Sequence, residues 1–443
     1  MKETLIKMLH NNEYTKIKEL LETTNNVDIS GWLDELPKEE MAVLYRLLDK
    51  DDAVDVFSYM ESDTQEELIG ALSDKELSEV IQNLFLDDAV ELVSEMPAVL
   101  VKRILKTAGQ EQRKWINEML KYPEDSAGSM MTIEFVDLQS DMSVQEAFDR
   151  IRYTGVDKET IYTCYVTDNQ RKLLGVITVK ALLLAALEDK IENIMETTVI
   201  CANTHQDKEV VAQMFEKYDF LAMPVVDMEE RLVGIITIDD AIDVLIEETT
   251  EDFEIMAAMK PSEDTYFKTS VLNHAKNRII WLLILMLSAT ITGGIILHYQ
   301  EAFANVPILV AFIPMLMDTG GNCGAQTSTL IIRGLAIGEV QLSDIAKCWW
   351  KEMQVSTIVG IILAVVNGIR ILVQYQDILL AIVVGITLVC TVVIAKSLGC
   401  ILPLVAKRFK FDPAIMAAPM ITTIVDACSI LIYFNVAILL MGI

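Results

Sequence analysis

Residues 312–334 read FIPMLMDTGGNCGAQTSTLIIRG, an apolar stretch interrupted by glycines and polar side chains. It is long enough to cross a membrane, because a helix needs about 20 residues to traverse the hydrocarbon core. Gly320 and Gly324 have the spacing that permits close helix packing, but packing alone does not explain the polar residues beside them. Those residues are Asp318, Thr319, Asn322, Gln326, Thr327, Ser328 and Thr329. Polar side chains at membrane depth are costly and usually functional, and neutral oxygens with a few carboxylates suit the path of a cation.

Long apolar runs continue from Arg278 to the end of the chain. We predict five membrane helices, at about 279–298, 307–332, 354–373, 378–403 and 414–440. Basic residues are concentrated in alternate connections: Lys276, Arg278, Arg333, Lys347, Lys351, Lys407, Arg408 and Lys410. Arg370 is the exception. By the positive-inside rule this pattern predicts a multi-pass membrane protein, with its N-terminus and soluble domains in the cytoplasm and its C-terminus outside.

Asp426 is the carboxylate of the last apolar run, APMITTIVDACSILIYF. We expect Pro413 to open that helix, because proline is favoured at the first helical position. Asp426 would then lie about 20 Å along the helix, inside a hydrocarbon core of about 30 Å. It is either a protonated group bonded to a neighbouring helix or a carboxylate facing a water-filled path. In the second case Thr422 and Thr423 would add oxygens to the path.

Charged and apolar residues are segregated along the chain. The 443 residues hold 36 Lys and Arg against 65 Asp and Glu, a formal charge of −29, and 52% are hydrophobic. Residues 276–443 contain ten basic and eight acidic residues, which leaves 26 basic and 57 acidic residues, a charge of −31, for residues 1–275. This composition excludes a simple cytosolic enzyme, a collagen-like chain and a disulfide-stapled secreted domain. It also argues against nucleic acid as a partner, because the acidic half would repel phosphate.

The acidic half contains a helical repeat. LPKEEMAVLYRLLDKDDAVDVFSYM (36–60) aligns with LSDKELSEVIQNLFLDDAVELVSEM (72–96) at a constant offset of 36 residues. A period in this range predicts stacked helical units over about residues 30–130, each too small to bury its own apolar face. We expect a weaker third copy from Ala108 to about Met131.

A second repeat follows at an offset of 59 residues, where CYVTDNQRKLLGVITVKAL (164–182) aligns with MPVVDMEERLVGIITIDDA (223–241). Each copy predicts two strands and a helix, and the tandem resembles a CBS-domain pair, a sensor module that often binds adenine nucleotides. The ribose-binding pattern of that family, Ser or Thr followed three residues later by Asp, is present as Thr237 and Asp240. In the first copy Thr178 is followed by Ala181, which weakens the case for a nucleotide at that site.

The linker to the membrane half, IDDAIDVLIEETTEDFEIMAAMKPSE, is strongly acidic. We expect a helix from Asp239 to Met259, ended by Pro261. Its carboxylates are Asp239, Asp240, Asp243, Glu247, Glu248, Glu251, Asp252 and Glu254. A solvated charged face is the usual explanation for such a run. Hard divalent cations, which prefer oxygen ligands, would relieve the repulsion among these carboxylates.

An acidic helical domain, a CBS pair, an acidic connecting helix and five membrane helices together resemble the MgtE magnesium channels. The most specific motifs are MDTGGNCGAQTSTLIIRGLAIGE, IDDAIDVLIEETTED and DPAIMAAPMITTIVDACSILIYF. The resemblance implies a homodimer in the lipid bilayer of a bacterial cell membrane, with a pore on the two-fold axis and Asp426, Thr422 and Asn322 as pore residues. It implies Mg²⁺ as both transported and regulatory ion. It also allows ATP as a modulator, near Tyr165, Lys180 and Phe220.

In the same family cytosolic carboxylates bind Mg²⁺ and hold the gate shut. Matching motif by motif, the resemblance assigns this role to Asp55, Asp87, Glu91, Glu209, Asp219, Asp240, Asp243, Glu248, Glu251, Asp252 and Asp412.

We therefore predict a multidomain membrane protein with an all-α superhelical N-terminal domain, an α+β tandem CBS pair and an α-helical bundle of five transmembrane helices. The predicted domains are residues 1–130, 131–245 (with copies at about 131–190 and 194–245), a connecting plug helix at 246–275 and a pore domain at 276–443. The expected function is a magnesium-selective channel that imports Mg²⁺ and is closed by cytosolic Mg²⁺. An ion-coupled carrier of divalent cations and a membrane-anchored CBS nucleotide sensor are the alternatives. An enzyme is not expected, because the chain has no phosphate-cradling loop and no pairing of a nucleophile with a base.

Overall fold

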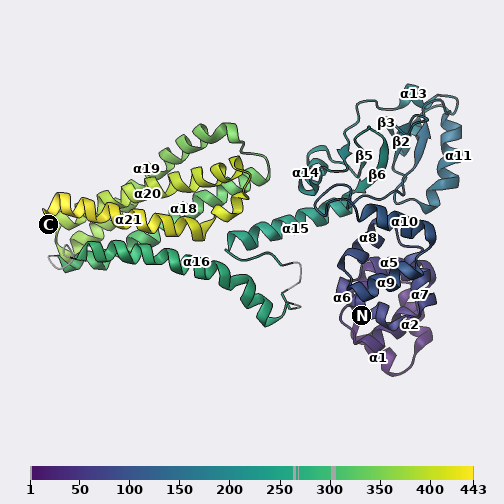
Figure 1. Ribbon diagram of the computed structural model, residues 1–443, viewed down its shortest axis with the longest axis horizontal. Coiled ribbons are helices and arrows are strands. Elements are labelled where there is room, and N and C mark those ends of the chain that lie inside the picture. The colour runs from purple at the N-terminus through teal and green to yellow at the C-terminus, as the bar shows by residue number, and fades with distance from the viewer. Residues whose placement is uncertain (1, 263–265, 268, 301–305, 443) are drawn as a thin grey trace. The chain divides into compact units, whose positions relative to one another are not determined.

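The computed structural model describes residues 2–262, 266–267, 269–300 and 306–442. The chain divides into two compact units, Met1–Leu245 and Ile246–Ile443 (Figure 1). The first contains a helical array and two small α/β modules, and the second contains the long apolar helices. The predicted fold class is confirmed.

The helical array is more regular than the sequence repeat predicts. Its helices begin every twelve residues, so the 36-residue repeat corresponds to three helices. They are α1 (Lys2–His10), α2 (Tyr14–Leu21), α3 (Asn26–Leu33), α4 (Lys38–Tyr45), α5 (Lys50–Ser58), α6 (Ser62–Ala71), α7 (Asp74–Ile81), α8 (Leu86–Glu95), α9 (Ala98–Thr107) and α10 (Gln110–Met119). Helices two apart in the array pack together (α3 with α5, α4 with α6, α5 with α7, α7 with α9 and α8 with α10), and residues such as Leu68 and Leu77 are completely buried. The expected third copy is limited to α10, because no helix lies between Met119 and Val144.

Two modules of the same topology follow the array. In each, a short strand pairs in parallel with the first strand of an antiparallel hairpin. The first module contains β1 (Asp137–Gln139), α11 (Val144–Thr154), η1 (Gly155–Asp157), β2 (Thr163–Thr167), β3 (Leu173–Thr178), α12 (Val179–Leu184) and α13 (Ile191–Ile194). The second contains β4 (Ala202–Asn203), α14 (Lys208–Tyr218), β5 (Ala222–Val226), β6 (Leu232–Thr237) and the start of α15 (Ile238–Met256).

The hairpins of the two modules obey the 59-residue offset, but the connections between the preceding helix and the hairpin differ in length. Residues 155–162 join helix to strand in the first module, whereas only residues 219–221 do so in the second. The hairpin tips lie next to each other, because Lys172 and Arg231 form an antiparallel bridge. The first module therefore carries a longer loop that has no counterpart in the second.

Five helices of the second unit are long and apolar enough to cross a membrane, as predicted. They are α16 (Val271–His298), α18 (Ile313–Ala336), α19 (Ile345–Tyr375), α20 (Ile378–Arg408) and α21 (Ala418–Met441). Short 3₁₀ turns precede three of them: η2 (Pro307–Phe312), η3 (Leu342–Asp344) and η4 (Pro413–Met416). Several helices extend beyond the predicted apolar cores, since polar residues continue the backbone hydrogen bonding outside the hydrocarbon region.

Two predicted helix boundaries are wrong. Pro413 opens the turn η4 and not α21, and the chain is extended at Ala417 before it restarts a helix with Pro419 in the first turn. Asp426 therefore lies about 12 Å along α21, less than expected. The connecting helix also differs, because α15 ends at Met256 and none of the described residues between 257 and 270 is helical.

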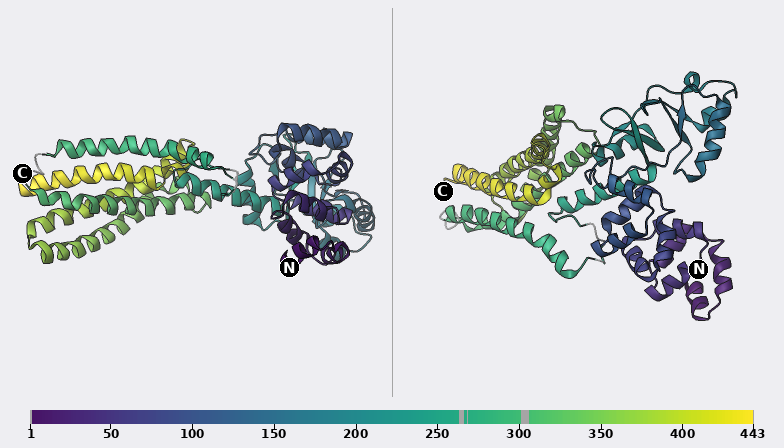
Figure 2. Two further views of the ribbon diagram at one scale, coloured as in Figure 1. Left: turned by 90° about the horizontal axis from the view of Figure 1, so that it is seen from below. Right: turned by 45° about the vertical axis from the view of Figure 1, so that its right-hand side comes forward.

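Glycines hold α18 against α20 and α21, and these helices lie side by side in both views of Figure 2. A Cβ on Gly320 would lie 2.8 Å from Val425 Cγ1, and one on Gly324 would lie 2.5 Å from Ile421 Cγ2. Gly399 of α20 lies directly against the backbone of Gly324. The glycines are thus explained by close packing, and this packing decides which face of α18 is left uncovered.

Candidate functional site

The uncovered face of α18 is polar. Asp318, Asn322, Gln326 and Thr329 are all exposed, and their spacing places them along one side of the helix. The opposite side is buried against α20 and α21. Polar side chains at membrane depth normally face a protein interior or a water-filled cavity. This polar stripe of α18 (Asp318, Asn322, Gln326 and Thr329) is therefore the candidate wall of an ion path.

The last helix contributes its carboxylate beside this stripe. Asp426 is half-buried on α21 and close enough to Asp318 for the two charges to repel each other. Thr422 lies one turn before Asp426 and contacts α18 at Gly321, the neighbour of Asn322. Its hydroxyl donates to the carbonyl of Pro419 at 3.0 Å, which leaves the oxygen's lone pairs available. The predicted pore residues thus lie on facing parts of α18 and α21.

Sequence reasoning missed a buried charged group behind the stripe. The Lys396 ammonium on α20 donates to Thr327 Oγ1 at 3.1 Å, and that hydroxyl donates to Glu352 Oε2 on α19 at 2.9 Å. The Lys396–Glu352 distance is 3.6 Å, with side-chain exposures of 7% and 15%. This Thr327–Glu352–Lys396 group ties three helices together. The sequence does contain a sign of this group, because Lys396 interrupts the predicted membrane helix 378–403 and Glu352 lies just before the one at 354–373.

The C-terminal part of α18 and the segment before α21 meet the end of the connecting helix. Ile255 and Met256 of α15 pack against Ile332 of α18 and against Ala414 and Ala417. The predicted Asp412 lies directly before this contact, where its Oδ1 accepts a hydrogen bond from the Ala414 backbone at 2.8 Å. The predicted carboxylates Glu248, Glu251 and Asp252 lie within the preceding turns of α15.

In the first unit carboxylates gather between α8, the start of α15 and the long loop of the first module. Asp87, Asp88, Glu159, Asp239 and Asp240 influence one another electrostatically. We call these five residues the acidic cluster. Sequence reasoning singled out Asp87, Asp239 and Asp240 but missed Asp88 and Glu159, because nothing in the repeat places residues 155–162 near α8.

Burial and mutual repulsion raise the pKa values of four members of the acidic cluster, Asp87, Asp88, Glu159 and Asp240. Burial is the largest cause in each case, and neighbouring carboxylates add to it. The pKa is raised to about 6 for Asp88, about 7 for Asp240 and about 8 for Glu159, and it is well above its ordinary value for Asp87. Glu159 Oε2 is buried with no hydrogen-bond partner among the described residues. A buried carboxylate without a partner is unfavourable, and a cation would relieve it.

The other predicted regulatory residues of the first unit lie on α5, α8, α14 and α15. Asp55 is exposed on α5 and accepts a hydrogen bond from Asn26 at 3.1 Å. Glu91 and Asp243 lie one helical turn beyond Asp87 and Asp240. Glu209 and Asp219 lie at opposite ends of α14 and are not brought together. Within the described parts of the chain, no three Asp, Glu, His or Cys side chains are arranged to hold a metal ion directly.

The residues expected near a nucleotide have different environments. Tyr165 is fully buried in β2, and its hydroxyl has no partner among the described residues. Lys180 is exposed in the first turn of α12, and Phe220 stacks on Tyr218 with 5.5 Å between ring centroids. Thr178 caps α12 through the Ala181 backbone at 3.1 Å, whereas Thr237 donates to the Asp240 carboxylate at 2.7 Å.

Three known family models match successive parts of the chain. The MgtE intracellular N domain matches residues 24–125, the CBS domain matches 127–188 and 191–247, and the divalent cation transporter domain of MgtE matches 313–436. The magnesium transporter MgtE of Thermus thermophilus is 34% identical over 441 residues, covering 99% of this chain and 98% of the relative. The chain belongs to the MgtE family of magnesium transporters. The MgtE transporter of Bacillus subtilis is 32% identical, with coverages of 98% and 96%.

Solved structures support the fold of the first unit. The cytosolic domain of the Mg²⁺ channel MgtE in complex with ATP is 32% identical, with a TM-score of 0.53. The match covers 55% of this chain and all of that one. The soluble part of a magnesium transporter is 28% identical with the same TM-score, covering 56% of this chain and 97% of the other.

The acidic cluster makes the stability of the first unit of this MgtE protein pH-dependent. Carboxylates with raised pKa values stabilise the folded state most below their ordinary pKa of about 4, and that stability is lost as the pH rises through the folded values. In EDTA we expect the free energy of unfolding of residues 1–245 to fall by at least about 2 kcal/mol between pH 5 and pH 8.5. Urea unfolding measures this. Glu159→Gln should flatten the slope above pH 7, and a free energy that rises over this range would contradict the arrangement.

The Thr327–Glu352–Lys396 group should behave as a coupled buried pair. Lys396→Met leaves the Glu352 carboxylate buried without its cation, which we expect to destabilise the protein by about 3–5 kcal/mol. Adding Glu352→Gln should recover much of that loss, which thermal unfolding in detergent detects as non-additivity. The exposed pair Lys347–Asp344, at 3.0 Å, is the matched control and should show nearly additive, small effects. Additive losses at Glu352 and Lys396 would argue against the pairing.

Proposed function

We propose that this MgtE protein is a magnesium channel whose pore forms between two copies of the chain. The observation that carries the proposal is the uncovered polar stripe of α18 beside Asp426. A single chain leaves this face exposed, and the bilayer cannot solvate it. A second copy related by a two-fold axis would place the same stripe opposite, so that two Asp426 carboxylates line one water-filled path.

Hydrated Mg²⁺ suits such a path. Mg²⁺ gives up its waters reluctantly and is usually bound through a few carboxylates. Two Asp426 side chains, with oxygens from Thr422 and Asn322, would hold the ion through its waters. Such binding is strong enough to admit the ion and weak enough to release it.

Import follows if the acidic unit lies in the cytoplasm. The loop charges support that orientation, and the Lys407 ammonium caps the end of α18 by donating to the Leu335 carbonyl at 3.1 Å. The C-terminus would then lie outside. Mg²⁺ would enter down its electrical gradient, without an enzymatic step.

Closure by cytosolic Mg²⁺ is supported by two features. The acidic cluster concentrates repelling carboxylates that a divalent ion would bridge, and the end of α15 packs on the inner ends of the membrane helices. Mg²⁺ bound to the regulatory carboxylates would favour the state in which α15 holds those ends together. A ligand can shift the equilibrium only through such a difference in affinity between the two states.

ATP is a further proposed modulator. A relative's cytosolic domain is solved in complex with ATP, and this chain retains Tyr165, Lys180 and Phe220 where the resemblance places the nucleotide. Ala181 removes the expected ribose ligand, so we expect a weaker site than one with aspartate.

Mg²⁺ flux into proteoliposomes tests the pore. We expect Asp426→Asn to reduce the flux at least about tenfold, because the path loses its charge with little change in shape. Asp377→Asn is a control. Asp377 caps the start of α20 and does not belong to the polar stripe of α18. Wild-type flux from a folded Asp426→Asn protein would overturn the pore assignment. Flux that requires a proton gradient would instead favour a coupled carrier.

Electrical recording with Mg²⁺ titrated on the cytosolic side tests the gate. We expect Asp240→Asn and Glu159→Gln to raise the inhibitory concentration of Mg²⁺ at least about threefold without changing the maximal current, because the closed state loses bridging ligands. Asp149→Asn removes an exposed carboxylate outside the cluster and is the control. Equal inhibitory concentrations in all four proteins would exclude the cluster from the sensor.

A further inference from the structure

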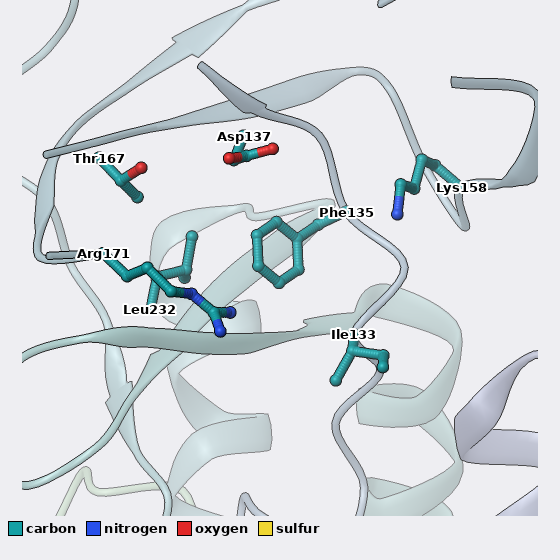
Figure 3. Close-up of a pocket in the computed structure, with 7 residues that line it drawn as sticks. All are labelled: Ile133, Phe135, Asp137, Lys158, Thr167, Arg171 and Leu232. Carbon is teal, nitrogen blue, oxygen red and sulfur yellow. The ribbon is translucent and has the colours of Figure 1, made fainter. Parts of the chain in front are cut away.

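A pocket of about 240 Å³ lies between the two modules of the first unit (Figure 3). Phe135 stands at its centre, with Ile133 and Leu232 as further apolar walls and Thr167 and Asp137 at one edge. The Lys158 ammonium and the Arg171 guanidinium reach toward the space beside Phe135 from opposite sides. None of the residues expected near ATP, and none of the acidic cluster, lines this pocket.

The pocket is positive within a strongly acidic unit. Many basic residues of this unit have carboxylate partners, such as Arg103 with Asp74 and Arg231 with Asp227. Lys158 and Arg171 have none among the described residues. Asp137, the pocket's acidic wall, is neutralised by Arg150, whose Nη2 lies 2.5 Å from Oδ1. Two cations therefore face the pocket without a counter-charge. This is unexpected in a unit that has so many carboxylates available as partners.

Comparison of the two modules shows that the backbone does not require these cations. Arg171 and its repeat counterpart Glu230 occupy the same left-handed position of equivalent hairpins, with φ of 65° and 64°. Glu230 pairs with Lys172 at 3.0 Å, whereas Arg171 faces the pocket. Lys158 lies in the longer loop, residues 155–162, that the second module lacks. Lys158 and Arg171 therefore have no basic equivalents in the second module, and the positive charge at the pocket comes from the first module alone.

We propose that this pocket binds a compact phosphate-bearing anion of roughly diphosphate size. The planar guanidinium of Arg171 can hold two phosphate oxygens at once, and Lys158 adds a point charge from the other side. The Thr167 hydroxyl supplies a further donor, and Phe135 with Leu232 accommodates a small apolar part. The volume is below the range of about 300–1,000 Å³ typical of drug-sized ligands. The small volume favours a compact anion over a whole nucleoside triphosphate, and the lining residues differ from those expected near ATP, which separates this site from the proposed ATP site.

Calorimetric titration of the full-length protein in detergent, with EDTA present, tests the proposal. The probes are inorganic pyrophosphate and ribose 5-phosphate, which distinguish an inorganic from an organic source of the phosphate. We expect at least one of them to bind the wild type saturably. Arg171→Glu should weaken that binding at least tenfold, and Lys158→Gln several-fold.

Lys172→Gln is the matched control. It removes a cation from the same hairpin as Arg171, but Lys172 does not line the pocket. It should change the affinity less than twofold. Absence of saturable binding by the wild type, equal weakening by Lys172→Gln and Arg171→Glu, or wild-type affinity in the Arg171→Glu protein would each overturn the proposal. Loss of binding in Phe220→Ala with retention in Arg171→Glu would assign the anion to the proposed ATP site and would likewise overturn it.

Discussion

The contact of α18 with α20 and α21 through glycine is the constraint on which the membrane unit depends. Gly320, Gly324 and Gly399 leave no room for a Cβ, so α18 can approach its neighbours only in one rotational setting. That setting buries one side of the helix and leaves the other side, with Asp318 and Asn322, uncovered. Because polar groups cannot remain against lipid, the same packing that stabilises the single chain creates the need for water or a second copy.

The buried Thr327–Glu352–Lys396 group complements this glycine packing. Thr327 donates a hydrogen bond to Glu352 and accepts one from Lys396, and these directional bonds add to the glycine contacts a constraint on the position of α18 along its axis. The desolvation cost of two buried charges makes such a pair a poor source of stability. We interpret it as a device that specifies the arrangement of three helices around the proposed ion path.

Electrostatic repulsion has the complementary role in the acidic unit. Asp88 of α8, Glu159 of the loop after α11 and Asp240 of α15 are half-buried close together, which raises their pKa values instead of stabilising the fold. Protons stabilise a unit with this arrangement, and a bound divalent cation would do the same. Near pH 7 the raised pKa values leave part of the cluster protonated, so that Mg²⁺ bound there, as in the proposed closure, would displace protons. The cationic pocket beside Phe135 shows that the same unit also keeps a separate positive surface.

The sequence by itself determined the order of the helical array, the paired modules and the five apolar helices, as well as both repeats, and it singled out the carboxylates Asp426 and Asp240. These follow from hydrophobic length, periodicity and charge, which are local along the chain, whereas Asp87 was assigned only through the resemblance to the MgtE channels. Only the tertiary structure decided that Asp88 and Glu159 join the acidic cluster, that Glu352 pairs with Lys396, and that Lys158 and Arg171 share a pocket. These residues are far apart in sequence or lie in loops outside the repeats, so no local pattern indicates their contacts. The wrong start of α21 has a different cause: Pro413 and Pro419 are a local signal that a helix can break, but the contact of the η4 turn with α18, and not hydrophobicity, accompanies the break at Ala417.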